Sequence, residues 1–243
     1  MSTFRAALLG TVLAIGGAVA ADAAVIVNSA IGGAPTAVGV TRDNFDNLAP
    51  GSSGVFARSG YTLTITPGAQ VASGNVGGQY AAPVLSGANG NGFGSPDQPD
   101  GVNATPYLTS GSTGSVAASA ITFSFSAPQS YLGVLWGSVD AYNSILFYSG
   151  ATLLATVTGN DVNAVIPNGS QAADGTAYVN LSASNAASAF DRVVFRSSQF
   201  AFEFDNVAFA PFVPTGVPVP ASLALLGMGL LGLVAARRRP AHA

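Results

Sequence analysis

Short runs in which apolar and polar residues alternate one by one dominate the middle of this chain, and they argue against a helical fold. In the clearest run, Ile121, Phe123 and Phe125 alternate with threonine and serine. A period of two places the apolar side chains on one face of a strand, whereas an amphipathic helix needs a period near 3.6. Only a turn around residues 183–189 departs from this pattern. The pattern therefore predicts an all-β domain over residues 24–210.

Further segments show the same period or a denser apolar run. Residues 131–136 are almost entirely apolar, which indicates a central strand buried on both faces. Ser149-Gly150 separates two apolar segments and predicts a tight hairpin. The expected strands are 24–28, 38–41, 61–66, 80–84, 121–126, 131–136, 144–148, 151–158, 177–181, 190–196 and 200–209. Short strands at regular spacing predict an antiparallel β-sandwich with a jelly-roll-like architecture.

A long stretch between the two groups of strands, residues 86–114, has no strand pattern. It is rich in glycine, asparagine, serine, proline and aspartate. Loops of this length are usually functional or mobile. We expect either a flexible surface insertion, which is the favoured interpretation, or an interaction loop.

The first 23 residues have the composition of a secretory signal peptide. Arg5 supplies the positive charge, residues 6–19 form the apolar region, and small residues give two cleavage patterns that end at Ala20 and Ala23. An N-terminal anchor helix is the alternative, but the apolar run is short for a membrane span. We therefore expect export through the secretory translocon.

A second membrane-directed segment lies near the other end. The motif Val217-Pro218-Val219-Pro220 precedes an uncharged run over 221–236 and the cluster Arg237, Arg238 and Arg239. As a helix the run would be about 24 Å long, against about 30 Å of hydrocarbon, so it predicts a marginal transmembrane helix. The arginines indicate a stop-transfer signal and a cytoplasmic C-terminus. Residues 211–216 read as a linker.

The order of proline motif, Gly/Leu/Ala-rich helix and arginine cluster over residues 217–240 resembles the PEP-CTERM sorting tail of Gram-negative bacteria. The resemblance implies that Val217, Pro218 and Pro220 are recognised by exosortase, a membrane-embedded cysteine protease/transpeptidase, and that the helix is a transient inner-membrane anchor. The usual motif has glutamate where this chain has Val219, a departure that concerns processing efficiency. An ordinary C-terminal membrane anchor is the alternative.

The body is similar to other exosortase-dependent surface proteins in two places. Residues 143–148, followed by Gly150 and Leu153, resemble their recurring hairpin, and Phe204-Asp205-Asn206-Val207 resembles their closing strand. This resemblance implies a β-sandwich surface domain without a known biochemical activity.

The composition removes several classes of enzyme. The chain has no cysteine and no lysine, and its one histidine, His242, follows the predicted anchor. A Ser-His-Asp triad, a Ser–Lys dyad and a cysteine-based metal site are therefore excluded from the body. Four arginines against ten acidic residues over 24–216 provide no basic face for nucleic acid. A glycosidase needs only two carboxyl groups, for which the candidates are Asp140, Asp191, Glu203 and Asp205.

Phe-Asp-Asn occurs twice, at residues 45–47 and 204–206. The first and last strands of a sandwich often lie side by side, which would bring the two triplets together. Calcium takes oxygen ligands from aspartate, asparagine and carbonyl groups, so Asp43, Asp46 and Asp205 are candidate ligands of a structural calcium ion. Turn and cap roles are the favoured alternative for these residues, and we expect no other cofactor.

Three functional classes remain. The favoured one is an exported, non-enzymatic cell-surface or extracellular-matrix protein, cut by exosortase and associated with exopolysaccharide in a biofilm. The second is a carbohydrate-binding module, which needs coplanar exposed aromatic rings. Candidates are Tyr80, Tyr107, Trp136 and Tyr142, although core packing is favoured for Trp136. The third is a secreted glycoside hydrolase.

Overall fold

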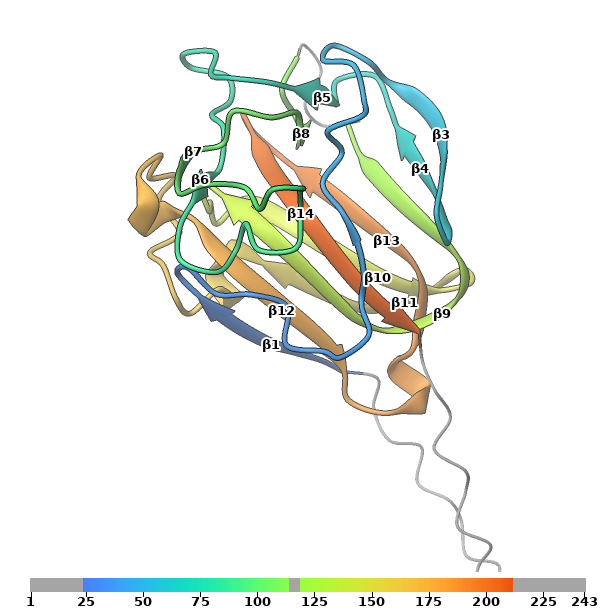
Figure 1. Cartoon of the computed structure of the whole chain (residues 1–243). Coiled ribbons are helices and arrows are strands. Elements are labelled where there is room, and N and C mark those ends of the chain that lie inside the picture. Colours follow the sequence, from blue (N-terminus) through green and yellow to red (C-terminus); the bar gives the residue numbers. More distant parts are fainter. Residues whose placement is uncertain (1–23, 114–118, 212–243) are drawn as a thin grey trace, which may run out of the picture.

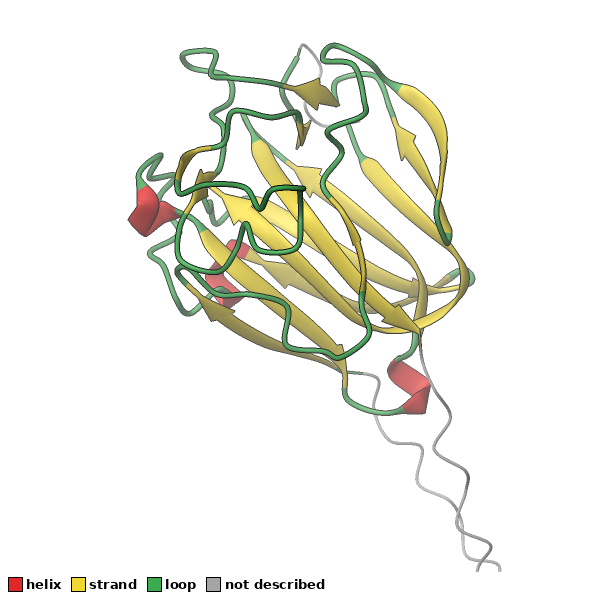
Figure 2. Cartoon of the chain, in the orientation of Figure 1, coloured by secondary structure: helices red, strands yellow, loops and turns green. Residues whose placement is uncertain are grey.

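The computed structural model describes residues 24–113 and 119–211, and these form an antiparallel all-β domain (Figure 1). Three short 3₁₀ turns are the only helical pieces of the described chain (Figure 2): η2 (Gly159–Asp161), η3 (Ala173–Gly175) and η4 (Ala186–Ser188). The predicted all-β antiparallel class is confirmed, whereas the jelly-roll-like arrangement stays a prediction. Within the described ranges, no helix has the length and apolarity to cross a membrane.

The strands follow the chain from end to end of the domain. They are β1 (Val25–Ala30), β2 (Thr41–Asp43), β3 (Gly54–Arg58), β4 (Tyr61–Ile65), β5 (Gln70–Ala72), β6 (Val84–Leu85), β7 (Gly101–Val102), β8 (Tyr107–Ser110), β9 (Ile121–Gly137), β10 (Asn143–Ser149), β11 (Thr152–Thr158), β12 (Ala177–Ala183), β13 (Phe190–Ser197) and β14 (Phe202–Pro211). Gly150 adopts a φ of 56° in the hairpin between β10 and β11, which is the tight turn expected at Ser149-Gly150.

Strand β9 organises the main sheet because it changes partners along its length. Its first part pairs with β4 and β13, and its second part pairs with β12 and β14. The prediction of two separate strands, 121–126 and 131–136, is wrong. The exposed residues 126–128 between them, which include Pro128, lie where the neighbouring strands change, so the strand continues through.

Aromatic side chains from both parts of the sheet meet in one core. Phe195 of β13 stacks on Phe204 of β14 with ring centroids 4.0 Å apart, and Trp136 of β9 stacks on Phe202 at 4.4 Å. Phe45, from the loop after β2, contacts Phe204 edge-on. Such pairs add about 0.5–1.5 kcal/mol each to the burial of their area. Trp136 is fully buried, as expected of a core residue.

Residues 85–105 cover one face of β9, β12 and β14, whereas residues 107–110 form β8, which pairs with β14 and β5 in the main sheet, so the stretch 86–114 expected to have no strand does contain one. Leu85 and Phe93 pack there against Tyr131, Leu135 and Tyr178. The expected flexible insertion is therefore a packed cover. Its polar side chains form internal hydrogen bonds. They do so because a segment outside the sheet must still pair its buried polar groups.

The strands that were predicted from weak patterns also differ from the strands of the structure. The strand expected at 38–41 is β2, which begins at Thr41, and Val38 is 97% exposed. Residues 80–84 contribute only Val84 to β6, while Tyr80 forms an isolated bridge with Val76. The pattern missed β3, in which apolar residues do not alternate regularly.

Candidate functional site

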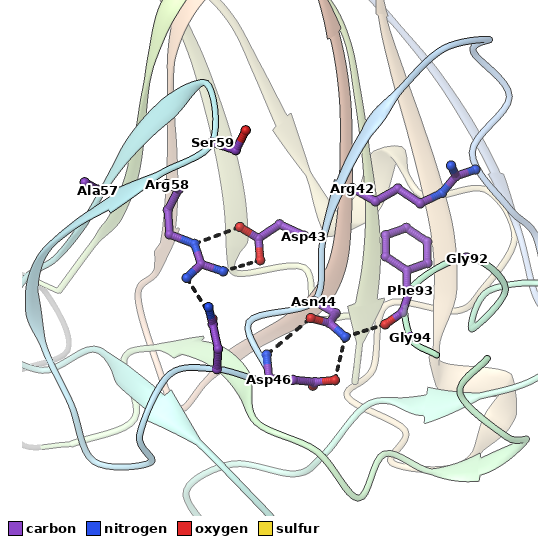
Figure 3. Close-up of a pocket in the computed structure, with 11 residues that line it drawn as sticks. Arg42, Asp43, Asn44, Asp46, Ala57, Arg58, Ser59, Gly92, Phe93 and Gly94 are labelled. Carbon is purple, nitrogen blue, oxygen red and sulfur yellow. Dashed lines mark hydrogen bonds and ion pairs between the residues drawn. The ribbon is translucent and has the colours of Figure 1, made fainter. Parts of the chain in front are cut away.

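A hollow of about 590 Å³ lies between β2, the loop that follows it, β3 and the cover (Figure 3). Two arginines and two aspartates face it, so its formal charges balance. Its lining residues are Arg42, Asp43, Asn44, Asp46, Asn47, Ala57, Arg58, Ser59, Gly92, Phe93 and Gly94.

Asp43 and Arg58 form a two-pronged ion pair in this hollow. Arg58 donates from Nε to Oδ2 at 2.8 Å and from Nη2 to Oδ1 at 2.5 Å, and the Tyr61 hydroxyl donates to Oδ2 at 2.7 Å. Hydrogen bonding to Asp43 raises the pKa of Arg58, and burial raises the pKa of Tyr61. Both charged side chains are nearly buried, so the pair holds the loop after β2 against β3 and β4.

The two Phe-Asp-Asn triplets meet, as their repetition predicted. Strand β2 pairs with β14, with Asp43 opposite Val207, and Phe45 contacts Phe204. Each triplet contains a left-handed residue, Phe45 with φ 59° and Asn206 with φ 47°. The sequence signal therefore marked two neighbouring segments, a loop after β2 and an irregular part of β14, whose phenylalanines lie in the core.

Asp205 is fully buried and has its own partners. Asn103 donates to its Oδ2 at 2.6 Å, the backbone N–H of Asn206 donates to its Oδ1 at 2.7 Å, and burial raises its pKa. Asn206 in turn donates to the Asn89 carbonyl oxygen and to Gln98. Sequence reasoning missed these cover residues, because only the fold brings them to β14.

The three candidate calcium ligands hold different positions. Asp43 is paired with Arg58, Asp205 lies beneath the cover, and Asp46 accepts a hydrogen bond from Asn44 at 2.5 Å, with its pKa raised by burial. Within the described ranges, no three acidic or histidine side chains gather closely enough to hold a metal ion. Calcium binding by these residues stays a prediction.

The four candidate glycosidase carboxyl groups lie in three places. Asp140 and Glu203 line a second cavity of about 230 Å³. Burial raises the pKa of Glu203 to about 8 and also raises that of Asp140. Asp191 instead accepts a hydrogen bond from Gly150 N at the β10–β11 hairpin. No motif pointed to the Asp140–Glu203 pair, because the end of β9 and the start of β14 meet only in the folded sheet.

The four aromatic residues considered for carbohydrate binding also lie in different places. Trp136 and Tyr107 are fully buried, so neither offers a face to a ligand. Tyr80 and Tyr142 are half-buried and belong to the wall of the second cavity. These four residues therefore do not form the row of exposed coplanar rings that is expected of a surface carbohydrate platform.

The family model of the PEP-CTERM protein-sorting motif matches residues 216–239. The chain carries a PEP-CTERM sorting domain. This tail contains the proline motif and all three arginines of the stop-transfer cluster, and it directs an exported protein of a Gram-negative bacterium to exosortase while anchoring it transiently in the membrane. No curated protein matches the chain.

The PEP-CTERM match assigns no activity to the β-domain, since it covers only the tail. Val217, Val219 and Arg237 to Arg239 lie outside the described residues, as do the predicted signal cleavage positions Ala20 and Ala23. The signal peptide stays a prediction, although export by the PEP-CTERM route is consistent with it.

Proposed function

We propose that this protein is a non-enzymatic component of the cell surface or extracellular matrix. After export it is held in the inner membrane by its tail, cut by exosortase, and associated with exopolysaccharide in a biofilm. The observation that carries the proposal is the sorting motif over residues 216–239. Its destination outside the membrane follows from what such tails do, and the β-domain is the part delivered there.

The way the domain uses its few charges supports a structural role. Asp43 and Arg58 neutralise each other, and Asp205 is held by Asn103 beneath the cover. Buried groups of this kind fix loops rather than face a substrate. Only 8% of the residues are charged, and a surface of low charge suits hydrogen bonding to a hydrated polysaccharide.

The cavity that holds Asp140 and Glu203 supports a second candidate, a carbohydrate-binding module. Two half-buried tyrosines and two carboxyl groups in one small cavity are the kinds of side chain that bind sugars. The same two carboxyl groups, with raised pKa values, also favour testing for glycoside hydrolysis, the third candidate.

Mass spectrometry of the mature protein tests the sorting step. In cells with exosortase we expect a product that has lost the residues after the Val217–Pro220 motif and that begins after Ala20 or Ala23. In cells without exosortase the tail should remain. A chain that still ends at Ala243 in exosortase-bearing cells would contradict the proposal.

Fractionation of the biofilm tests the matrix role. We expect the mature protein in the washed matrix fraction of a strain that makes exopolysaccharide, and in the free medium of an otherwise identical strain that does not. An equal distribution in the two strains would contradict association with the polysaccharide, even if exosortase processing is normal.

A further inference from the structure

The second cavity lies where four strands of the sheet begin or end. Strand β9 ends beside it, and β10, β12 and β14 begin there, because Gly137 pairs with Glu203 and Trp136 pairs with Ala177. Its wall is completed by the loops around residues 78–80 and 168–171. The lining residues are Gly78, Gln79, Tyr80, Ser138, Asp140, Tyr142, Asn168, Gly169, Gln171, Phe200, Ala201 and Glu203.

Glu203 is the least satisfied group in this wall. It is 2% exposed, and its Oε1 accepts a hydrogen bond from the backbone N–H of Ala81 at 3.0 Å. Its Oε2 is buried and has no hydrogen-bond partner among the described residues. A buried polar atom without a partner is unfavourable, so rotation of the Glu203 side chain toward the cavity would let a hydroxyl group of an occupant pair with Oε2.

The wall offers hydrogen bonds without positive charge. Gln79, Asn168 and Gln171 supply amides, and the Tyr142 hydroxyl donates to the Phe200 carbonyl oxygen at 2.6 Å. Arginine is absent from the described lining, and the chain has no lysine. An anionic ligand would therefore face Asp140 without a compensating cation, whereas a neutral ligand would not.

The aromatic residues and the volume restrict the ligand further. Tyr80, Tyr142 and Phe200 border the cavity, whose exposed lining consists mostly of polar atoms, and Phe200 is 42% exposed. A cavity of about 230 Å³ is smaller than the roughly 300–1,000 Å³ of sites for drug-sized ligands. The combination of amides, a carboxyl group and rings in so small a space suits a single ring that carries hydroxyl groups.

We propose that this cavity binds one neutral sugar residue of a polysaccharide, with Glu203 and Asp140 as hydrogen-bonding groups for its hydroxyls. The inference deepens the proposed matrix role and rests on it only for the source of the glycan. Because burial raises the pKa of Glu203 to about 8, this carboxyl group is mostly protonated at neutral pH and can both donate and accept.

Saturation-transfer NMR on the full-length protein in detergent tests the site. The probes are the methyl glycosides of glucose, galactose and mannose, with methyl glucuronide as the anionic counterpart. We expect binding of at least one neutral glycoside and an affinity for the glucuronide that is lower by about tenfold or more. No binding of any neutral glycoside, or equal binding of the glucuronide, would overturn the proposal.

Four variants locate the binding. Gln171→Trp fills the cavity from an exposed rim position and should weaken binding by about tenfold or more. Thr152→Trp, which introduces the same side chain at the exposed β10–β11 hairpin, should leave binding unchanged. Glu203→Gln keeps a donor and an acceptor and should retain binding, whereas Glu203→Leu should lose it. Binding that Gln171→Trp leaves intact would overturn the proposal, and this variant remains informative if Glu203→Leu fails to fold.

The outcomes separate this inference from the proposed function. Failure of exosortase processing would contradict the sorting role without affecting sugar binding by the purified chain. Release of reducing sugar from a neutral oligosaccharide, lost in Gln171→Trp, would contradict the non-enzymatic role and support the cavity as the sugar site.

Discussion

Glu203 makes the stability of the domain depend on pH. Burial, with a smaller contribution from the charge of Asp140, raises its pKa from 4.5 to about 8, and Tyr107 and Tyr142 also lie close. The folded protein then binds more protons than the unfolded chain between those two values, so its free energy of unfolding falls as pH rises through this window. The contribution is fully present below about pH 4.5 and is lost above pH 8, on the order of 4 kcal/mol.

Thermal unfolding at pH 5 and pH 8.5 measures this dependence. We expect a lower melting temperature at pH 8.5, and a smaller drop in Glu203→Gln, whose side chain cannot ionise. Asp100→Asn, which removes an exposed carboxyl group, should keep the drop of the natural chain. If Glu203→Gln shows the same drop, Glu203 is not its source; Asp205, buried with a raised pKa, would remain.

The Asp43–Arg58 ion pair gives a second prediction at the scale of single residues. Asp43→Ala leaves the Arg58 guanidinium and the Tyr61 hydroxyl without their shared acceptor, so we expect a loss of about 2–4 kcal/mol in the free energy of unfolding. The double variant Asp43→Ala/Arg58→Ala should lose less than the sum of the single variants. Arg196→Ala, at an exposed arginine, should change it by less than about 0.5 kcal/mol. Strict additivity in urea unfolding would show that the pair is not coupled.

At the scale of elements, Gly133 tests how β9 packs under the cover. A Cβ at this position would lie 2.5 Å from the Tyr131 hydroxyl and 2.7 Å from the Tyr178 hydroxyl. Both tyrosines are buried, so they cannot move away freely. Gly133→Ala should therefore reduce the free energy of unfolding by about 1–3 kcal/mol. Gly77→Ala, where a Cβ meets no atom within 4 Å, is the matched control and should be nearly neutral.

Sequence reasoning found strands that show either regular alternation or a dense apolar run. β4 and β10 alternate, β12 and β13 are denser runs, and each of the four matches a predicted segment. The cover could not be predicted from composition. Asparagine and glutamine are common both in solvated loops and in buried hydrogen-bond networks. Only the pairing of Asn206 with Asn89 and Gln98 distinguishes the two.

The candidate sites were predictable to the extent that they rest on local pattern. The Phe-Asp-Asn repeat marked two segments that do meet, because β2 pairs with β14 and Phe45 contacts Phe204. The Asp140–Glu203 cavity depends on which strand ends lie together, and no short motif encodes that. Arg58 as the partner of Asp43 was missed for the same reason.

At the scale of the whole molecule, we expect the arginine cluster to hold the tail for processing. Replacing Arg237, Arg238 and Arg239 with glutamine removes the charge that stops transfer, so we expect the processed fraction to fall several-fold. Replacing the same three with lysine keeps the charge and should preserve processing. Immunoblots of precursor and mature protein in membrane and medium measure both. Normal processing of the glutamine variant would contradict the stop-transfer role.

Strand β14 connects the two functional ends of the domain. Glu203 lies at its beginning, in the cavity, and Pro211 ends it, beside Gln129. At about 3.3 Å per residue these ends are roughly 25 Å apart, and β1 begins near the end of β14 (Figure 1). The cavity therefore lies at the end of β14 opposite to the one that leads toward the sorting motif, so under the proposed function a domain still tethered by its tail would keep the cavity end free to meet glycan.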